Sequence, residues 1–245
     1  MDSTGTLTGM GVGPGDPALI TIKALRRLQS APVVAFPAGR YGQPGIAEQI
    51  VEPWLQPYQQ RLPLQFPYVF DAATLSDAWQ TAAQQVWQHL QSGQDVAFAS
   101  EGDIGFYSTF AYLAQTLLRQ QPVAKVCAIP GVCSPLAAAA AVGQPLTCQH
   151  QRLAVLPAVY SANELADELE SVMDWADVVV LLKLSSVYAQ VWQVLARLGL
   201  LERSYVVQRA TTADQIVYAG LGDLPELSLP YFSILVTQVR PVELG

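Results

Sequence analysis

The stretch VAFASEGDIGFYSTFAYLAQTLL, residues 96–118, indicates which class of fold the chain adopts. It begins with a short apolar run at 96–99, which predicts a buried parallel strand. A polar turn follows at 100–103, and residues 108–119 then carry apolar side chains at helical spacing, with Ser108 placed as the N-cap. Ligands of open α/β sheets bind outside the carboxyl ends of the strands, so this turn can present backbone N–H groups and carboxylates to a polar ligand. The alternative is an ordinary strand-to-helix turn without a ligand.

Strand-like and helix-like segments alternate along the whole chain. Before this stretch we predict strands at 4–10, 33–36 and 61–66 and helices at 17–29, 46–55 and 74–91. After it we predict strands at 125–129, 152–156, 178–184 and 204–208, helices at 137–142, 163–174 and 187–198, and a terminal antiparallel pair of 216–218 with 232–236. The alternation restarts after Pro145, which favours a domain boundary there. The sequence therefore predicts two α/β domains, residues 1–145 and 146–245.

The composition is that of a globular protein with a large core. The chain has 245 residues, of which 51% are hydrophobic and 13% are charged. Its net charge of −7 argues against a general nucleic-acid surface, although a local cleft can still be basic enough for an anionic small molecule. The amino terminus lacks a basic region followed by an apolar core, and no apolar run approaches the roughly 18 residues of a spanning helix. We therefore expect a soluble, cytoplasmic protein that does not bind membranes.

Cysteine and histidine usage argues against disulfides and metals. Cys127, Cys133 and Cys148 form no C-x-x-C pair, and their number is odd for a disulfide framework. His89 and His150, the two histidines, lie far apart in the sequence. We therefore predict that the protein itself has no metal site.

A glycine-rich turn follows the first predicted strand, and its spacing rejects ordinary dinucleotide binding. The glycines of GMGVGPGDP, residues 9–17, fall at every second position. Counted from Gly9, Pro14 occupies the third glycine position of G-x-G-x-x-G, and counted from Gly11, Asp16 occupies it. The second predicted strand also ends at Pro37, where that motif would have an acidic residue for a ribose hydroxyl.

Four polar or glycine-rich turns each follow a predicted strand. They comprise residues 9–17, 101–109, 130–134 and 209–212. Because the carboxyl ends of parallel strands share one edge of a sheet, the turns can converge on a common cleft.

The order and spacing of these turns resemble the tetrapyrrole methylase family, the C-methyltransferases that use S-adenosylmethionine, and the resemblance covers nearly the whole chain. The stretches at 33–49 and 98–113 look like the branch that methylates carbon 20 of precorrin-2, which has a similar "YPA" after the second strand and a GDP-x-FYST turn. The 64–87 stretch, with its spaced tryptophans, also looks like that branch. One departure is Ile104, which stands where the family has proline and is expected to loosen the turn.

The resemblance implies two α/β domains with the cofactor folded into the cleft between them, and a homodimer. Carried over by position, it assigns nine residues to S-adenosylmethionine: Pro14, Glu101, Gly102, Asp103, Phe106, Cys133, Ser134, Lys183 and Ala210. Carboxylates and backbone carbonyls can hold the sulfonium and ammonium groups of this molecule, and backbone N–H groups can hold its carboxylate.

Three further residues are candidates for the substrate side. Arg40 follows the second strand and can grip a propionate or acetate through two parallel hydrogen bonds; a solvated arginine on a glycine-rich loop is the alternative. Asp16 and Tyr107 lie in the cofactor turns, and an aromatic at a helix start, such as Tyr107, is more often a packing residue. No general base is identified, because Pro37 stands where a related branch carries an acid.

The expected reaction is methyl transfer to carbon 20 of precorrin-2 or of its cobalt complex. Two alternatives stay open. The chain could be a methylase of the same fold with another acceptor, such as a different macrocycle carbon, a protein histidine or ribosomal RNA. It could also be a non-catalytic module that binds the cofactor, although the presence of both Asp16 and Asp103 argues against this. The sequence does not identify which substrate form, with or without cobalt, is used.

Overall fold

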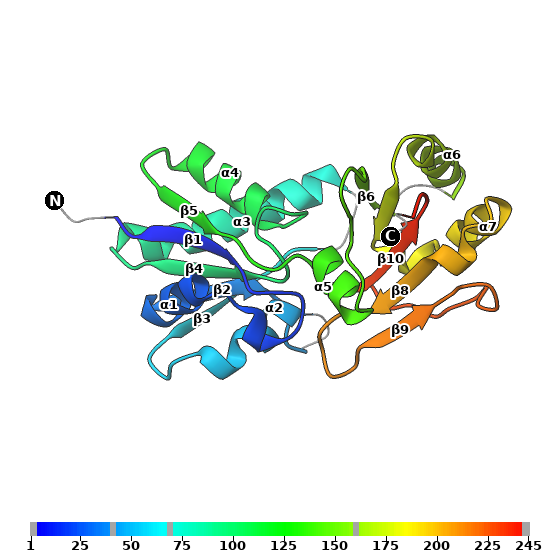
Figure 1. Cartoon of the computed structure of the whole chain (residues 1–245). Helices are drawn as coiled ribbons and strands as arrows, with labels where there is room; N and C mark the ends of the chain where they lie inside the picture. Colours follow the sequence, from blue (N-terminus) through cyan, green and yellow to red (C-terminus); the bar gives the residue numbers. More distant parts are fainter. Residues whose placement is uncertain (1–3, 40–42, 68–70, 159–161, 242–245) are drawn as a thin grey trace. The chain divides into compact units, whose positions relative to one another are not determined.

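The computed structural model describes residues 4–39, 43–67, 71–158 and 162–241, which belong to two compact units (Figure 1). The first unit comprises Met1–Cys133 and the second Ser134–Gly245. This division precedes the boundary expected near residue 145. The difference is helix α5 (Ser134–Ala141), which contacts strand β10 (Ser233–Gln238) of the second sheet.

The first unit is a parallel sheet with helices on both faces. Its elements in chain order are β1 (Thr6–Gly11), the helical turn η1 (Pro17–Leu19), α1 (Ile22–Ser30), β2 (Val33–Pro37), α2 (Ile46–Val51), the helical turn η2 (Glu52–Trp54), β3 (Gln60–Leu64), α3 (Ala72–Gln91), β4 (Val96–Ser100), α4 (Phe110–Gln120) and β5 (Lys125–Ile129). The strands are parallel and lie in the order β3-β2-β4-β1-β5.

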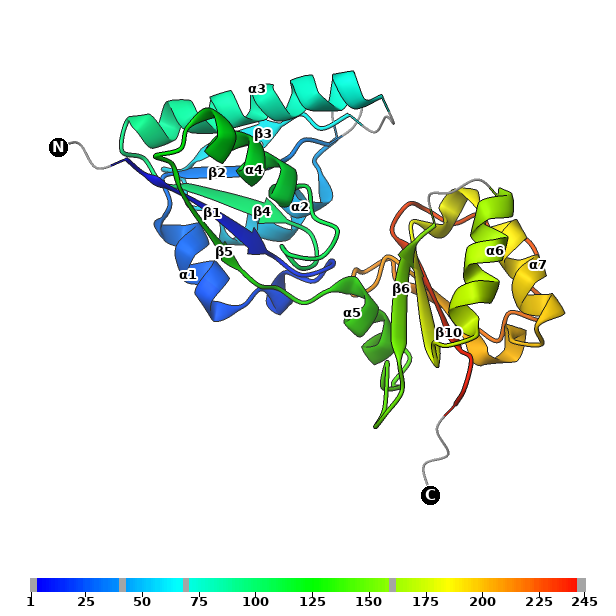
Figure 2. The same ribbon diagram turned by 90° about the horizontal axis from the view of Figure 1, so that it is seen from above.

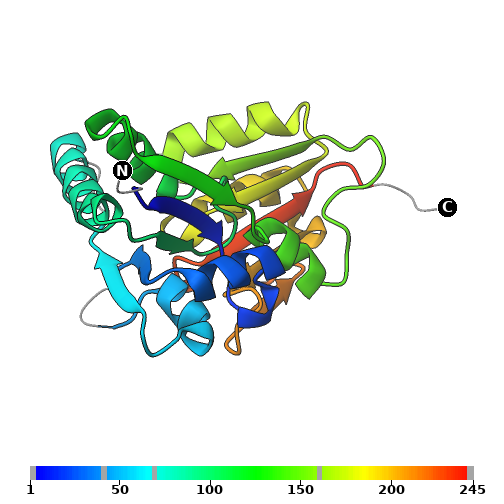
Figure 3. The same ribbon diagram turned by 90° about the vertical axis from the view of Figure 1, so that its left-hand side faces the viewer.

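Alternate residues of the central strands pack into two separate cores. Val96 and Phe98 of β4 pack with α3 and α4, whereas Ala97 and Ala99 pack with α1 and α2. Figures 2 and 3 show these two helix pairs on opposite faces of the sheet. Burial on both faces explains why the strand at 96–99 is a continuous apolar run, and this prediction is confirmed.

The helix predicted at 17–29 forms as two pieces. Asp16 caps the short turn η1, and Thr21 caps α1 through its side-chain oxygen. Between them the chain is extended at Ile20, which is buried, while Ile22 is 69% exposed. A continuous helix with apolar residues at 19, 22, 25 and 28 on one face would bury Ile22, whereas the break buries Ile20 instead.

The second unit is a mixed sheet. Besides α5 and β10, its elements are β6 (Leu153–Pro157), α6 (Ala162–Met173), β7 (Val178–Leu182), the helical turn η3 (Leu184–Ser186), α7 (Tyr188–Arg197), the helical turn η4 (Leu201–Arg203), β8 (Ser204–Gln208) and β9 (Ile216–Ala219). The strand order is β6-β7-β10-β8-β9, with β6 and β7 parallel and β10 antiparallel to both of its neighbours. Helix α5 lies on one face of this sheet, and α6 and α7 lie on the other (Figure 2).

The predicted terminal antiparallel pair is wrong. Strand β10 lies between β7 and β8, and β9 pairs with the far side of β8. The physical reason is burial. Nearly all residues of β10 are buried, as in a central strand covered on both faces. Ile216 and Val217 of β9 are exposed, as on an edge strand.

Candidate active site

Three of the four predicted turns come together at the carboxyl ends of the adjacent strands β4, β1 and β5. We call residues 11–17, 101–108 and 130–133 the turn cluster. Gly13 and Gly102 exchange backbone hydrogen bonds of 2.7 and 3.2 Å, and the N–H of Val12 donates to the carbonyl of Ser100 at 3.0 Å. The first two turns are therefore joined directly through their backbones.

Asp103 joins the second turn to the third. Its Oδ2 accepts a hydrogen bond from the N–H of Gly131 at 2.7 Å, and its Oδ1 accepts one from the N–H of Gly105 at 2.8 Å. Both bonds are charge-assisted, so the carboxylate stabilises the arrangement of the turns. The family resemblance assigned Asp103 to the cofactor, and this structural role of its carboxylate was not predicted. Each carboxylate oxygen can still accept a second hydrogen bond.

The glycines of the turn cluster allow backbones to pass very close to one another. A Cβ atom on Gly11 would lie 2.6 Å from the carbonyl oxygen of Gly102, and one on Gly131 would lie 2.5 Å from the same oxygen. A Cβ on Gly9 would lie 2.4 Å from the ring of Phe110. The GMGVG pattern therefore serves turn-to-turn packing rather than a dinucleotide fingerprint.

Glu101 is a half-buried carboxylate at the end of β4. Burial raises the pKa of its carboxyl above the ordinary value, because desolvation disfavours the charged form. None of the ion pairs among the described residues involves it. A partly desolvated carboxylate of this kind, at a strand end, is suited to receive a cationic group from a ligand.

The loop between β4 and α4 is anchored by Ile104, which is 6% exposed and packs in the core beneath α3 and α4. The isoleucine at the position of the family's proline thus anchors the turn to the core, and the expected loosening is not seen. Phe106 is half-buried and makes an edge-to-face contact with Tyr107, with ring centroids 4.9 Å apart. Tyr107 is 51% exposed and has a φ of 52°, an uncommon conformation for a residue with a side chain.

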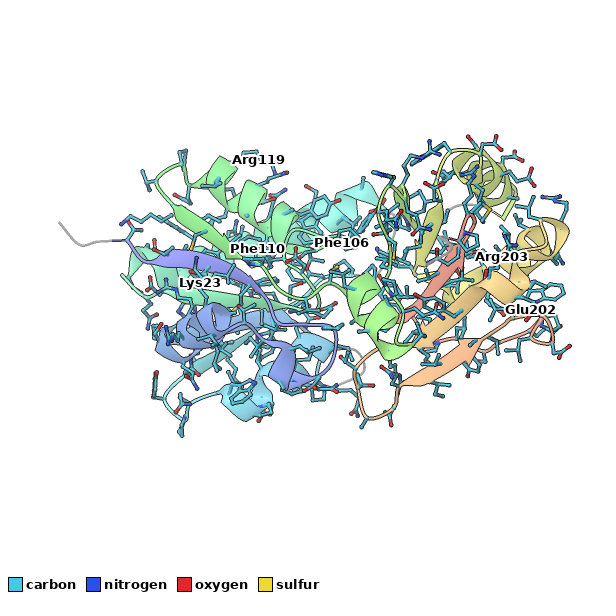
Figure 4. The ribbon with its side chains drawn as sticks, viewed as in Figure 1. Lys23, Phe106, Phe110, Arg119, Glu202 and Arg203 are labelled. Atoms are coloured by element: carbon cyan, nitrogen blue, oxygen red, sulfur yellow. The ribbon has the colours of Figure 1, made fainter. Side chains whose placement is uncertain are left out.

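Helix α4 begins two residues later than predicted. Its N-cap position is Thr109, whose side chain makes no capping bond, and Ser108 instead accepts a hydrogen bond from the N–H of Phe110 at 3.2 Å. Phe106 lies in the loop before the helix and Phe110 in its first turn (Figure 4). Ser108 also contacts Ser100 through their hydroxyl oxygens, 3.0 Å apart, so it links the loop back to β4.

The remaining first-unit candidates have different positions. Pro14 is half-buried and follows Gly13, whose φ is 85°. Asp16 accepts a hydrogen bond from the N–H of Ala18 at 2.8 Å and so acts as a helix cap. Cys133 is half-buried at the end of the first unit. Arg40 lies outside the described residues.

In the second unit, candidate residues gather at the carboxyl ends of β7 and β8, which flank β10. We call Lys183, residues 209–212 and Tyr231 the second-unit edge. Lys183 directly follows β7 with a φ of 60°, and its Nζ lies 6.0 Å from the centre of the Tyr231 ring. Ala210 is buried in the turn after β8. Ser134, the remaining candidate, is the first residue of α5.

The turn after β8 is held by side chains and by strained backbone. Arg209 and Thr211 have φ values of 48° and 69°. The N–H of Thr211 donates to Oε1 of Gln215 at 2.7 Å, and the guanidinium of Arg209 pairs with Asp214 at 3.1 Å. The N–H of Arg209 donates to the carbonyl of Phe232 at 2.8 Å, which ties this turn to the start of β10.

Neither the position of Tyr231 nor the left-handed backbone conformations were predicted from the sequence. Of five non-glycine residues with positive φ in the described part of the chain, four lie at strand ends in the candidate turns: Tyr107, Lys183, Arg209 and Thr211. Such strain costs about 1–3 kcal/mol per residue and clusters at functional sites. No residue-type signal marks αL conformation at a tyrosine or lysine, and finding Tyr231 required knowing that β10 is central.

The described residues contain neither a group of metal ligands nor a membrane-spanning helix. Among them, no three histidine, cysteine, aspartate or glutamate side chains are grouped as metal ligands. None of the helices in the described ranges combines the length and apolar character needed to cross a membrane.

The first unit thus carries hydrogen-bonded turns at the ends of three adjacent strands, and the second carries a strained turn after β8. The chain matches the family Tetrapyrrole (Corrin/Porphyrin) Methylases over residues 6–225 and belongs to it. S-adenosylmethionine is the methyl donor of this family.

Curated relatives cover nearly the whole chain. The chain is 38% identical over 242 residues to the cobalamin biosynthesis protein CobIJ of Mycobacterium tuberculosis; the match covers 96% of this chain and 46% of that protein, so the chain spans about half of its length. It is 31% identical over 240 residues to a precorrin-2 C(20)-methyltransferase of Sinorhizobium sp., covering 95% and 94%. It is 31% identical over 233 residues to a cobalt-precorrin-2 C(20)-methyltransferase of Salmonella typhimurium, covering 95% of each.

Solved structures share the fold. A uroporphyrin-III C-methyl transferase from Thermus thermophilus, complexed with S-adenosylhomocysteine, has a TM-score of 0.67 at 21% identity, with 95% of this chain and 97% of that chain covered. A cobalt precorrin-4 methyltransferase has a TM-score of 0.70 at 20% identity, with 96% of both chains covered. These likenesses confirm the predicted α/β class.

Proposed function

We propose that this chain transfers a methyl group from S-adenosylmethionine to carbon 20 of precorrin-2, or of its cobalt complex, in cobalamin biosynthesis. The observation that carries the proposal is the end-to-end similarity, 31% over 95% of the chain, to relatives named for this reaction. The branch-like stretches at 33–49 and 98–113 support it.

We propose that the turn cluster binds the methionine part of S-adenosylmethionine. Glu101 offers a half-buried carboxylate without an ion-pair partner among the described residues, which suits a sulfonium or ammonium group. The close backbone packing at Gly11, Gly102 and Gly131 favours a rigid surface to which a ligand binds with little loss of conformational entropy. Pro14, Phe106, Cys133 and Ser134 are further proposed contacts.

We assign Lys183 and Ala210 of the second-unit edge to the adenosine on the same basis of resemblance. The left-handed backbone at Lys183 supports this, because strain of that kind is retained where function requires it. Replacing Lys183 by Ala is expected to weaken binding of S-adenosylhomocysteine by calorimetry without lowering the melting temperature. Unchanged affinity would remove Lys183 from the site.

For methyl transfer, the main task of the protein is to position the two substrates. S-adenosylmethionine supplies a methyl group bound to a sulfonium. The electron-rich meso carbon attacks this methyl group in line, and the sulfur leaves as a neutral thioether. The turn cluster would hold the reacting groups in line and exclude water, which can supply most of the rate enhancement. A base must also remove the meso proton; among the candidates, no residue is assigned that role.

The substrate side is proposed to include Arg40, Asp16 and Tyr107, and the active form is proposed to be a homodimer. Arg40→Ala should raise KM for the macrocycle, leave cofactor affinity unchanged and make the rate less sensitive to salt. Kinetics at two ionic strengths measure this, and identical macrocycle constants in wild type and variant would exclude Arg40.

The direct test is mass spectrometry of precorrin-2 and of cobalt-factor II, each incubated with the protein and S-adenosylmethionine. A product heavier by one methylene unit from either macrocycle supports the proposal, and comparing the two macrocycles identifies the preferred form. Calorimetry on the same sample gives cofactor affinity. Tight cofactor binding without turnover of any tetrapyrrole would favour a non-catalytic module instead.

A further inference from the structure

Away from the strand-end turns, the first unit has an open pocket between helix α1 and the edge strand β5. Its volume is about 430 Å³, within the range of small-molecule sites. Six of its lining residues matter here: Thr8, Lys23, Arg26, Arg27, Ser30 and Cys127. The pocket exists because β5 is the last strand of the sheet and its residue Cys127 is exposed, whereas the neighbouring strand β1 is covered.

Helical spacing directs several polar side chains of α1 into this pocket. Lys23, Arg26, Arg27 and Ser30 are three or four residues apart, so they follow one stripe of the helix. Figure 4 shows Lys23 on this helix. A chain with a net charge of −7 thus places three of its 13 basic residues along one pocket wall.

Arg27 is held in place, while its two basic neighbours are available. Its Nε donates to Oγ1 of the buried Thr8 at 3.0 Å, and its guanidinium pairs with Asp95 at 2.9 Å. Lys23 and Arg26 form no ion pair within the described part of the chain. After Asp95 is counted against Arg27, the pocket keeps two uncompensated positive charges.

The rest of the pocket lining is mixed: Thr8 and Cys127 carry a hydroxyl and a thiol, whereas Ala128 and Ile129 are apolar. Cys127 Sγ lies 3.2 Å from Oγ1 of Thr8, at the centre of the β1–β5 pairing. The positive charges of Lys23 and Arg26 along one wall favour an oxyanion over a neutral ligand.

We propose that this pocket is a second ligand site, which binds a small oxyanion bearing carboxylate or phosphate groups. The guanidinium of Arg26 and the ammonium of Lys23 would bind its oxygens, whereas the hydroxyl of Ser30 already donates to the carbonyl of Arg27 at 3.1 Å. The site is distinct from the turn cluster, because none of the residues that line the pocket belongs to that cluster. It does not depend on the proposed methyl transfer.

Cys127 provides a built-in reporter. The rate at which neutral N-ethylmaleimide modifies Cys127 is followed by mass spectrometry of the peptide, with inorganic phosphate or citrate added and ionic strength held constant with sodium chloride. A ligand that occupies the pocket should slow this rate roughly tenfold at about ten times its dissociation constant, by mass action. Cys133 and Cys148 serve as internal controls and should react at unchanged rates.

The variant Lys23→Gln/Arg26→Gln should abolish the protection, and the matched variant Arg119→Gln should keep it. Arg119 is an exposed arginine of α4, outside the pocket (Figure 4). Protection by phosphate alone, citrate alone or both identifies the oxyanion and supports the site. Absence of protection, equal protection by sodium chloride, or protection that survives in the double variant would each overturn the proposal.

Discussion

The two groups of strand-end residues, one in each unit, are built in different ways. In the turn cluster, backbones pass so closely that a methyl group on Gly11 or Gly131 would lie under 3 Å from a carbonyl oxygen. In the second-unit edge, the turn after β8 is held by the side chain of Gln215 and contains left-handed backbone at Arg209 and Thr211. The first group therefore depends on glycines that leave room for close backbone contact, together with the carboxylate of Asp103, whereas the second has side-chain contacts and left-handed backbone at residues other than glycine. Substitutions should separate the two.

The largest effect is expected for Gly11→Ala. Its Cβ would meet the backbone of Gly102, Asp103 and Gly131 at 2.6–2.9 Å, and backbone cannot give way cheaply. We expect a loss of about 3 kcal/mol in the free energy of unfolding, measured by urea denaturation. The control is Gly102→Ala, where a Cβ has open space and only the φ of 72° is unfavourable, for a loss of about 1 kcal/mol. Equal losses would show that the turns are not closely packed.

A smaller loss is expected for Asp103→Ala. The substitution removes the acceptor for the N–H groups of Gly131 and Gly105, and the first of these is partly buried. We expect the free energy of unfolding to fall by about 2 kcal/mol, and cofactor binding to weaken by a similar amount if the carboxylate also contacts it. A stability loss with an unchanged dissociation constant would assign Asp103 to the turn alone.

Asp177, in the second unit, should control part of the acid sensitivity. Its pKa is lowered first by the backbone N–H of Arg152 and then by the side chains of Arg152 and Arg240. A carboxyl with a lowered folded pKa stabilises the fold above its ordinary pKa of 3.8, and this stability is lost as pH falls through the folded value. Asp177→Asn should lower the melting temperature at neutral pH and narrow its difference from wild type in acid. A constant difference at every pH would contradict this linkage.

The smallest effect, with the opposite sign, is expected at Glu101. Its folded pKa is raised by burial, so its contribution to stability is fully present below the ordinary value of 4.5 and is lost as pH rises through the folded value. Glu101→Gln should therefore raise the melting temperature at neutral pH and weaken binding of S-adenosylmethionine. A variant that binds the cofactor as well as wild type would show that the carboxylate is not needed there.

Much of the fold follows from local patterns. The apolar runs at 33–36 and 96–99 predicted strands, and both are confirmed because parallel strands buried on both faces leave little ambiguity. The strand predicted at 125–129 is also confirmed, as a partly exposed edge strand. The position of β10 could not be predicted, because strand order depends on contacts between distant segments. The break at Ile20 was also hidden, since the helical spacing of 19, 22, 25 and 28 continues through it.

The sequence predicted which turns form the candidate site, but it did not predict what each residue in those turns does. Turn residues at strand ends identified the turn cluster, because the edge that they share follows from parallel pairing. Asp103 was recognised as important, yet its bond to Gly131, 28 residues away, is a tertiary contact. Lys183 and Arg209 follow β7 and β8, which are separated by β10, and this strand order was not predicted.

The proposal that the chain methylates carbon 20 is tested most directly by locating the transferred methyl group. S-adenosylmethionine labelled isotopically in its methyl group is incubated with the protein and the preferred macrocycle, and nuclear magnetic resonance identifies the carbon that becomes bonded to the label. The account predicts that the labelled methyl is attached to the meso carbon 20. A label on any other macrocycle carbon, or recovery of all the label in unreacted S-adenosylmethionine, would contradict it.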